Sequence, residues 1–192
     1  MAIKKFDKRE RILKAALNLF SERGFHNTPT SLIAKEAGVA TGTLFHHFKN
    51  KEELINALYL ELKRSLVDAI AVEFDDTVSL KEKIKITWIN GVKWGIMHPK
   101  EIHFIFQYAH SPFITHLTRE QAKSQYEFIA GIYEQAVQQG IIKSTYAEFI
   151  PDYFEGIFNL AVGHFRKHPD KISEENLEMA FDICWDGIAA KK

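Results

Sequence analysis

Two short helical segments joined by a glycine turn constrain this chain more than any other feature of its sequence. The first is predicted to begin at Thr28 and Pro29, since a threonine hydroxyl caps a helix and proline suits its first position. Gly38 ends it, and the second segment covers residues 41–48, with its apolar residues at helical spacing. A longer helical stripe over residues 9–24 precedes the pair. The sequence therefore predicts a helix-turn-helix, a unit whose second helix fits the major groove of DNA.

The predicted second helix of this unit carries side chains that suit contact with double-stranded DNA. Hydroxyl and imidazole groups donate hydrogen bonds to phosphate oxygens or base edges, and a glycine lets the backbone come close. Helix N-termini favour phosphate, and a lysine there adds a full charge. The candidate DNA-binding residues are Thr28, Thr41, Gly42, Thr43, Phe45, His46, His47 and Lys51. Adjacent histidines point about 100° apart around a helix, so His46 and His47 are not expected to share a metal ion.

The distribution of charge agrees with a DNA-binding N-terminus. Residues 1–51 carry ten Lys and Arg against four Asp and Glu, a net charge of +6, whereas the rest of the chain carries −6. A basic segment on an acidic body is expected when only that segment meets a polyanion.

Three runs of residues in one fixed register resemble the TetR/AcrR family of transcriptional regulators. These are residues 24–28 (GFHNT), 33–39 (IAKEAGV) and 42–54 (GTLFHHFKNKEEL). The resemblance implies a homodimeric repressor of a palindromic operator, with three N-terminal helices for DNA and about six more for dimerisation and ligand binding. Two positions depart from the family pattern. Ala40 stands where the family usually has Ser or Thr, which removes a helix cap, and Phe45 stands where Tyr commonly contacts a phosphate.

The remaining three quarters of the chain also show helical spacing, and no strand alternation is found. We expect an all-α fold of about nine helices, with a DNA-binding domain at 1–50 and a ligand-binding and dimerisation domain at 51–192. Residues 51–72 would form the connecting helix. Ser79 with Glu82, and Thr118 with Gln121, predict two helix starts with capping boxes.

A ligand pocket is expected among the middle helices, where aromatic side chains and a few polar groups suit an apolar or aromatic small-molecule effector. The candidate pocket residues are Trp88, Phe104, Gln107, His110, Tyr126 and Tyr133. The last two helices are the candidate dimer surface, through Phe158, Phe165, Phe181 and Trp185. Ordinary core packing explains both sets of residues as well.

The sequence predicts a regulator rather than an enzyme, because no phosphate loop, nucleophile elbow or paired-carboxylate site is recognisable. Histidine spacing matches no zinc pattern, so we expect neither a metal nor a cofactor. A single cysteine, Cys184, and no apolar run long enough for a membrane span lead us to expect a cytoplasmic protein without membrane contact.

Ligand binding in the larger domain is expected to move the connecting helix and release the operator. The alternative is a helical DNA-binding protein with an architectural or cell-division role and no inducer. A closed middle domain would favour that alternative.

Overall fold

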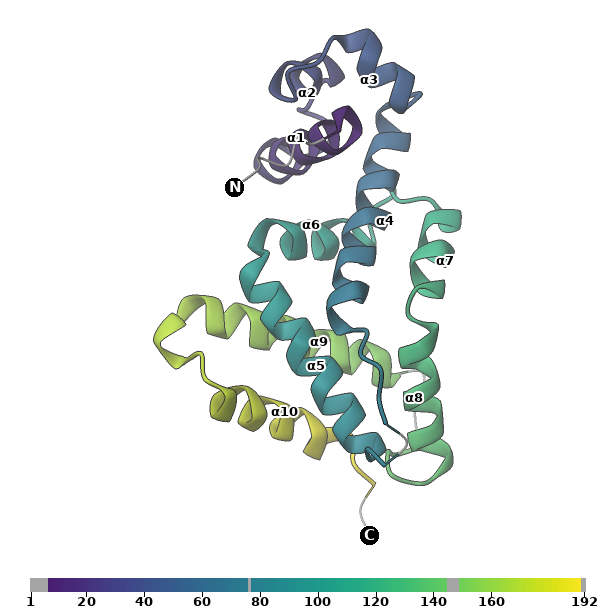
Figure 1. Ribbon diagram of the computed structural model, residues 1–192, viewed down its shortest axis with the longest axis vertical. Coiled ribbons are helices and arrows are strands. Elements are labelled where there is room, and N and C mark those ends of the chain that lie inside the picture. The colour runs from purple at the N-terminus through teal and green to yellow at the C-terminus, as the bar shows by residue number, and fades with distance from the viewer. Residues whose placement is uncertain (1–6, 76, 145–148, 191–192) are drawn as a thin grey trace. The chain divides into compact units, whose positions relative to one another are not determined.

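The chain is built from helices, which confirms the predicted all-α fold class. The computed structural model describes residues 7–75, 77–144 and 149–190, and these form ten α-helices and one 3₁₀ turn (Figure 1). Within these ranges the extended pairing is a single antiparallel bridge between Ile142 and Ala189. The helices are α1 (Lys8–Arg23), α2 (Thr30–Glu36), α3 (Thr41–His47), α4 (Lys51–Ile70), α5 (Leu80–Met97), α6 (Pro99–Ala109), α7 (His116–Ser124), α8 (Glu127–Gln138), α9 (Phe149–Lys167), η1 (Pro169–Lys171) and α10 (Glu174–Ile188). None of the described helices is long and apolar enough to cross a membrane.

Short polar side chains start several of these helices, as the sequence predicts. Asp7 opens α1 with a complete capping box, and Ser79 accepts a hydrogen bond from the Glu82 amide at the start of α5. The second predicted capping box is wrong, because Thr118 lies inside α7 and is buried. Thr115 takes that place, and its hydroxyl accepts a hydrogen bond from the Thr118 amide at 3.1 Å. Helix α7 ends at Ser124, and α8 begins at Glu127.

The helices form two compact units, and each unit combines two stretches of the chain. Unit 1 contains residues 1–64 and 99–123, and unit 2 contains residues 65–98 and 124–192. The sequence-based boundary at residue 50 therefore does not coincide with this division. Residues 51–64 of α4, together with α6 and residues 116–123 of α7, are grouped with the helix-turn-helix rather than with the rest of the chain.

The core of unit 1 lies where α1 contacts α2, α3 and α6. Phe20 of α1 and Phe104 of α6 are fully buried, and their ring centroids lie 6.4 Å apart. The Tyr108 hydroxyl donates a hydrogen bond to the Phe20 carbonyl at 3.4 Å. Lys100 adds a hydrogen bond to the Asn18 side chain at 2.9 Å. These contacts fix α6 against α1.

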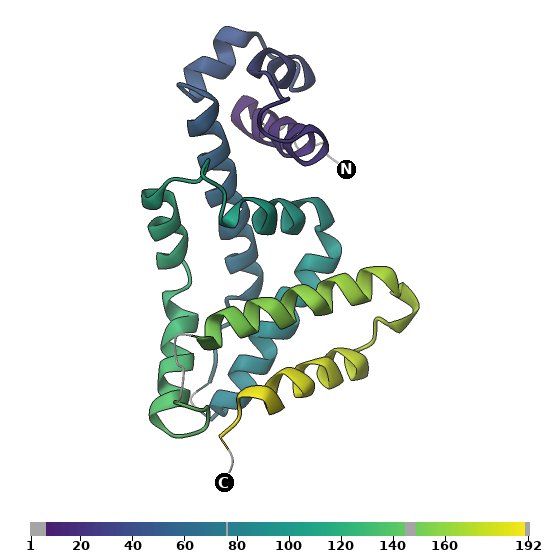
Figure 2. The ribbon, with the colours of Figure 1, turned by 180° about the vertical axis from the view of Figure 1, so that it is seen from behind.

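In unit 2, α5 is the central helix, and α8, α9 and α10 pack around it. Its Trp88 ring lies 5.9 Å from that of Phe181 on α10, between centroids. Gly91 allows close packing, because a Cβ at this position would lie 2.9 Å from the Phe158 ring. Helices α9 and α10 lie side by side and are joined through η1, as the view from behind shows (Figure 2).

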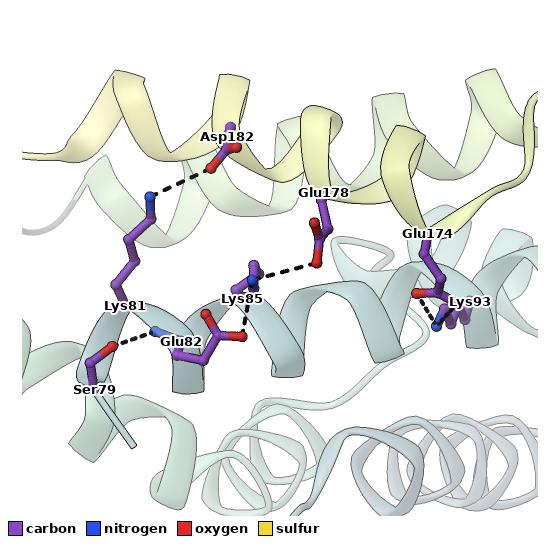
Figure 3. Close-up of polar contacts among 8 residues, drawn as sticks. All are labelled: Ser79, Lys81, Glu82, Lys85, Lys93, Glu174, Glu178 and Asp182. Atoms are coloured by element: carbon purple, nitrogen blue, oxygen red, sulfur yellow. Dashed lines mark hydrogen bonds and ion pairs between the residues drawn. The ribbon is translucent and has the colours of Figure 1, made fainter. Parts of the chain in front are cut away.

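A row of ion pairs joins α5 to α10 along their exposed edge (Figure 3). Lys81 pairs with Asp182 at 3.5 Å, and Lys85 pairs with Glu178 at 3.5 Å. Lys93 contacts both carboxylate oxygens of Glu174, at 2.7 and 2.9 Å. The acids follow one another at four-residue spacing on α10, so they occupy one face of that helix. The row aligns the two helices in antiparallel directions.

Candidate nucleic-acid interface

The turn between α2 and α3 is held by a backbone conformation that favours glycine. Gly38 has φ of 62°, and its neighbour Val39 donates an amide hydrogen bond to the Ala34 carbonyl at 3.0 Å. The Arg11 guanidinium, reaching from α1, donates to the carbonyls of Ala37 and Gly38. A side chain at position 38 would collide with it, because a Cβ there would lie 2.6 Å from Arg11 Nη2. Sequence reasoning missed this role of Arg11, whose only sequence signal is a charged residue beside an apolar stripe.

Helix α3 has one buried side and one side open to solvent. Leu44 of the helix and Phe48, the residue directly after it, are buried, and their burial fixes the orientation of the helix. Among the other residues of the helix, Thr41, Gly42, Phe45 and His46 are exposed, and Thr43 and His47 are half-buried. The six predicted residues of this helix are therefore all at least partly accessible to solvent. A short helix with hydroxyl, imidazole and aromatic groups on its free face can contact base edges and phosphates.

The predicted capping loss at α3 is present in the structure. Ala40 is the N-cap residue and makes no side-chain hydrogen bond, and the Thr41 hydroxyl does not replace it as the cap. Helix α2 likewise begins after Pro29 without a side-chain cap.

Thr28 differs from its predicted role as a helix cap and a phosphate contact. Its side chain is fully buried, and its hydroxyl donates to the carbonyls of Gly24 at 2.8 Å and Leu19 at 3.2 Å. Leu19 lies in the last turns of α1, and Gly24 directly follows the helix. Thr28 therefore ties the α1–α2 turn to α1, and its hydroxyl does not face solvent.

Lys51 begins α4 and lies against an aromatic ring instead of extending into solvent. Its Nζ is 4.3 Å from the centroid of the Phe25 ring. Partial burial lowers the pKa of the Lys51 ammonium from its ordinary value. Asn50 caps this helix by accepting a hydrogen bond from the Glu53 amide at 2.7 Å. The charge of Lys51 is thus placed at a helix N-terminus, where phosphate is favoured.

The six candidate pocket residues are divided between the two units. Phe104, Gln107 and His110 belong to unit 1, where Phe104 is core and the other two are exposed. The other three, Trp88, Tyr126 and Tyr133, belong to unit 2. Burial raises the pKa of the Tyr133 hydroxyl well above its ordinary value. Phe104 is accounted for by its packing on Phe20 of α1.

The four candidate dimer residues face mainly into their own chain. Phe165, Phe181 and Trp185 are buried, and Phe158 is half-buried against Gly91. On the opposite sides of α9 and α10, several large apolar side chains are exposed, with 67% of Leu160, 53% of Met179 and 67% of Ile183 accessible. Helical spacing located the apolar faces, but the four candidate aromatic residues lie inward, whereas Leu160, Met179 and Ile183 remain at the surface.

The fold and the α3 surface define a class of protein: a helical, helix-turn-helix DNA-binding protein. A model of the family described as bacterial regulatory proteins, tetR family, matches residues 12–58. A tetR family transcription regulator from Shewanella sp. PV-4 has a solved structure that is 34% identical, covers 97% of this chain and 100% of its own, and superposes with a TM-score of 0.88. This chain therefore belongs to the TetR family of transcriptional regulators, as the resemblance predicted.

Curated relatives agree over shorter stretches. The fatty acid metabolism regulator protein of Bacillus subtilis is 35% identical over 75 residues, which are 39% of this chain and 39% of that protein. The HTH-type transcriptional regulator UidR of Escherichia coli K12 is 49% identical over 53 residues, 28% of this chain and 27% of that protein. These two relatives and the Shewanella protein are all named as regulators. The names confirm the expectation that the chain is a DNA-binding transcriptional regulator rather than an enzyme.

Proposed function

We propose that the chain acts as a homodimeric repressor, binds a palindromic operator through α3, and leaves it when a small apolar or aromatic molecule binds. The exposed face of α3 carries this proposal. Its six polar, glycine and aromatic residues are exposed or half-buried, while Leu44 of the helix and Phe48 directly after it are buried and anchor α3. In a dimer, two such helices would enter successive major grooves about 34–36 Å apart.

Selection of bound duplexes from a random DNA pool tests the DNA part of the proposal. The wild-type chain is expected to enrich a palindromic motif. Thr43→Ala should lower the base preference at particular positions of the motif, and Lys51→Ala should weaken binding to all sequences about equally. Lys123→Ala, which removes an exposed charge from α7, is the matched control and should enrich the wild-type motif. Enrichment of no motif would refute sequence reading and would favour the architectural role.

Exposed aliphatic side chains on α9 and α10 support the homodimer. A monomer would leave Leu160, Met179 and Ile183 in water, whereas an isologous contact between two α9–α10 pairs would bury them. Sedimentation of Ile183→Glu is expected to show a folded monomer. Met97→Glu, at an equally exposed apolar position of α5, should sediment as the wild type does. A wild-type chain that sediments as a monomer at micromolar concentration would refute the dimer.

Buried polar atoms in unit 2 support a ligand. Trp88 Nε1, Gln125 Oε1 and Asn159 Oδ1 are buried without a hydrogen-bond partner among the described residues. Such groups are costly to bury unless something satisfies them. One donor and two amide acceptors suit a neutral molecule with hydroxyl or amide groups. A panel of aromatic alcohols and amides should contain compounds that raise the melting temperature and weaken operator binding together, and a compound that does the first without the second would contradict release.

A further inference from the structure

An aromatic stack joins two segments of unit 1 that are far apart in the sequence. Phe25, in the turn after α1, stacks on Phe113, in the loop between α6 and α7, with ring centroids 4.1 Å apart and planes 21° apart. His26 lies edge-on to both rings, at 5.8 Å from Phe25 and 5.1 Å from Phe113. The Phe25 ring is also the one on which the Lys51 ammonium rests. A residue of the α6–α7 loop is therefore linked to Lys51 through a single aromatic ring.

The loop that carries Phe113 is held by its own hydrogen bonds. The Arg119 guanidinium donates to the carbonyls of Ala109 at 3.1 Å and Ser111 at 2.8 Å. The Ser111 hydroxyl accepts a hydrogen bond from the Phe113 amide at 3.3 Å. At the far end of the loop, the Thr115 and Thr118 hydroxyls are 2.9 Å apart. These bonds hold the backbone of Phe113 in place from both sides.

A buried amide fastens the same loop to α4. Asn56 is only 9% exposed, and its Nδ2 donates to the Phe113 carbonyl at 2.8 Å. Its Oδ1 accepts a hydrogen bond from the Thr115 amide at 2.9 Å. Nδ2 also donates to the Glu52 carbonyl at 2.7 Å, one turn earlier in α4. The Asn56 side chain thereby fixes the distance between the loop and the first turns of α4.

We propose that Phe113 is a positioning residue for DNA binding. Its ring holds the Phe25 ring in place, and the Phe25 ring in turn holds the Lys51 ammonium where it can contact a phosphate. This inference rests on the proposed phosphate contact of Lys51. A lysine side chain loses considerable rotamer freedom when it binds a phosphate, and this loss is smaller when the side chain is already held against a ring. A cation 4.3 Å from a ring centroid is also attracted to the ring face. The α6–α7 loop therefore contributes to DNA affinity although none of its residues need touch DNA.

Measurement of operator affinity for Phe113→Ala tests the proposal, with duplexes from the selection experiment as the probe. The variant should bind DNA about three- to tenfold more weakly for each engaged protomer, because the aromatic pair that holds the Lys51 ammonium in place is removed. The plot of log affinity against log salt should also become less steep, by about 0.9 for each phosphate that the variant no longer neutralises. Phe113→Tyr should restore both values. Pro112→Ala, an exposed change in the same loop, is the matched control and should leave both unchanged.

Combination with Lys51→Ala separates positioning from general stability. If Phe113 acts through Lys51, the double variant binds no more weakly than Lys51→Ala alone. Additive losses, or a Phe113→Ala variant that binds with wild-type affinity and salt dependence, would overturn the proposal. Circular dichroism at the assay temperature verifies folding, and Phe25→Leu gives a second test if Phe113→Ala is unfolded. It keeps apolar bulk but removes the ring, so wild-type salt dependence in that variant would also overturn the proposal. Failure of the wild-type chain to bind any selected duplex would refute the proposed operator binding instead.

Discussion

Substitution of Thr28 by valine distinguishes a structural role of this residue from the DNA contact that its sequence position suggested. Valine keeps the shape of the side chain but removes the hydroxyl that donates to Gly24 and Leu19. In a fully buried site the two carbonyls lose that donor, at a cost of about 1–2 kcal/mol in the free energy of unfolding. For a chain of this length we expect the melting temperature to fall by about 2–8 °C.

The assay compares thermal unfolding, at fixed protein concentration, with operator binding measured well below the transition. Thr28→Val should melt earlier and bind DNA with wild-type affinity and salt dependence. Thr43→Val is the reciprocal control, because Thr43 lies on the α3 surface: its melting temperature should stay close to that of the wild type while its DNA affinity falls. The argument is refuted if Thr28→Val melts like the wild type and binds DNA more weakly.

Three further outcomes follow from other parts of the molecule. Ala40→Ser supplies the missing cap of α3 and should raise the free energy of unfolding by about 0.5–1 kcal/mol, measured by urea denaturation; no gain would contradict the capping argument. A double-mutant cycle on Lys93 and Glu174 should give a coupling of about 0.2–1 kcal/mol that disappears in 1 M salt, and a salt-independent coupling would indicate a different interaction. Burial raises the pKa of the Cys184 thiol to about 12, so the reactive thiolate is scarce up to pH 9; Cys184 should react with iodoacetamide only after unfolding, and fast labelling of the folded protein would show the thiol to be accessible.

Local signals in the sequence were sufficient for most of the fold. Glycines at 24 and 38 end helices because both adopt positive φ, and Asn50 and Ser79 cap the helices that follow them. Each of these features depends on a few neighbouring residues, so a single sequence contains it. The exposed face of α3 was predicted for the same reason, since helical spacing separates Leu44 and Phe48 from the residues between them.

Interactions between distant segments could not be read in this way. Thr28 is a residue type that commonly caps helices, yet its hydroxyl donates hydrogen bonds to carbonyls at and after the end of α1. Phe104 is a residue type that suits a ligand pocket, yet it packs on Phe20, 84 positions earlier. The aromatic residues of α9 and α10 lie on apolar faces, but spacing alone does not say which apolar face turns inward. Arg11 and Asn56 were missed because their partners are backbone groups, which carry no residue-specific signal.

The division of the chain into interleaved units has a consequence for recombination. The backbone crosses between the units three times, after residues 64, 98 and 123. A chimera that joins this N-terminal segment to another regulator at residue 50 or 64 would leave Phe20 without Phe104, and one joined at 64 would also leave Asn56 without its two loop partners. Exchange of DNA specificity between relatives therefore requires residues 99–123 to travel with the first 64.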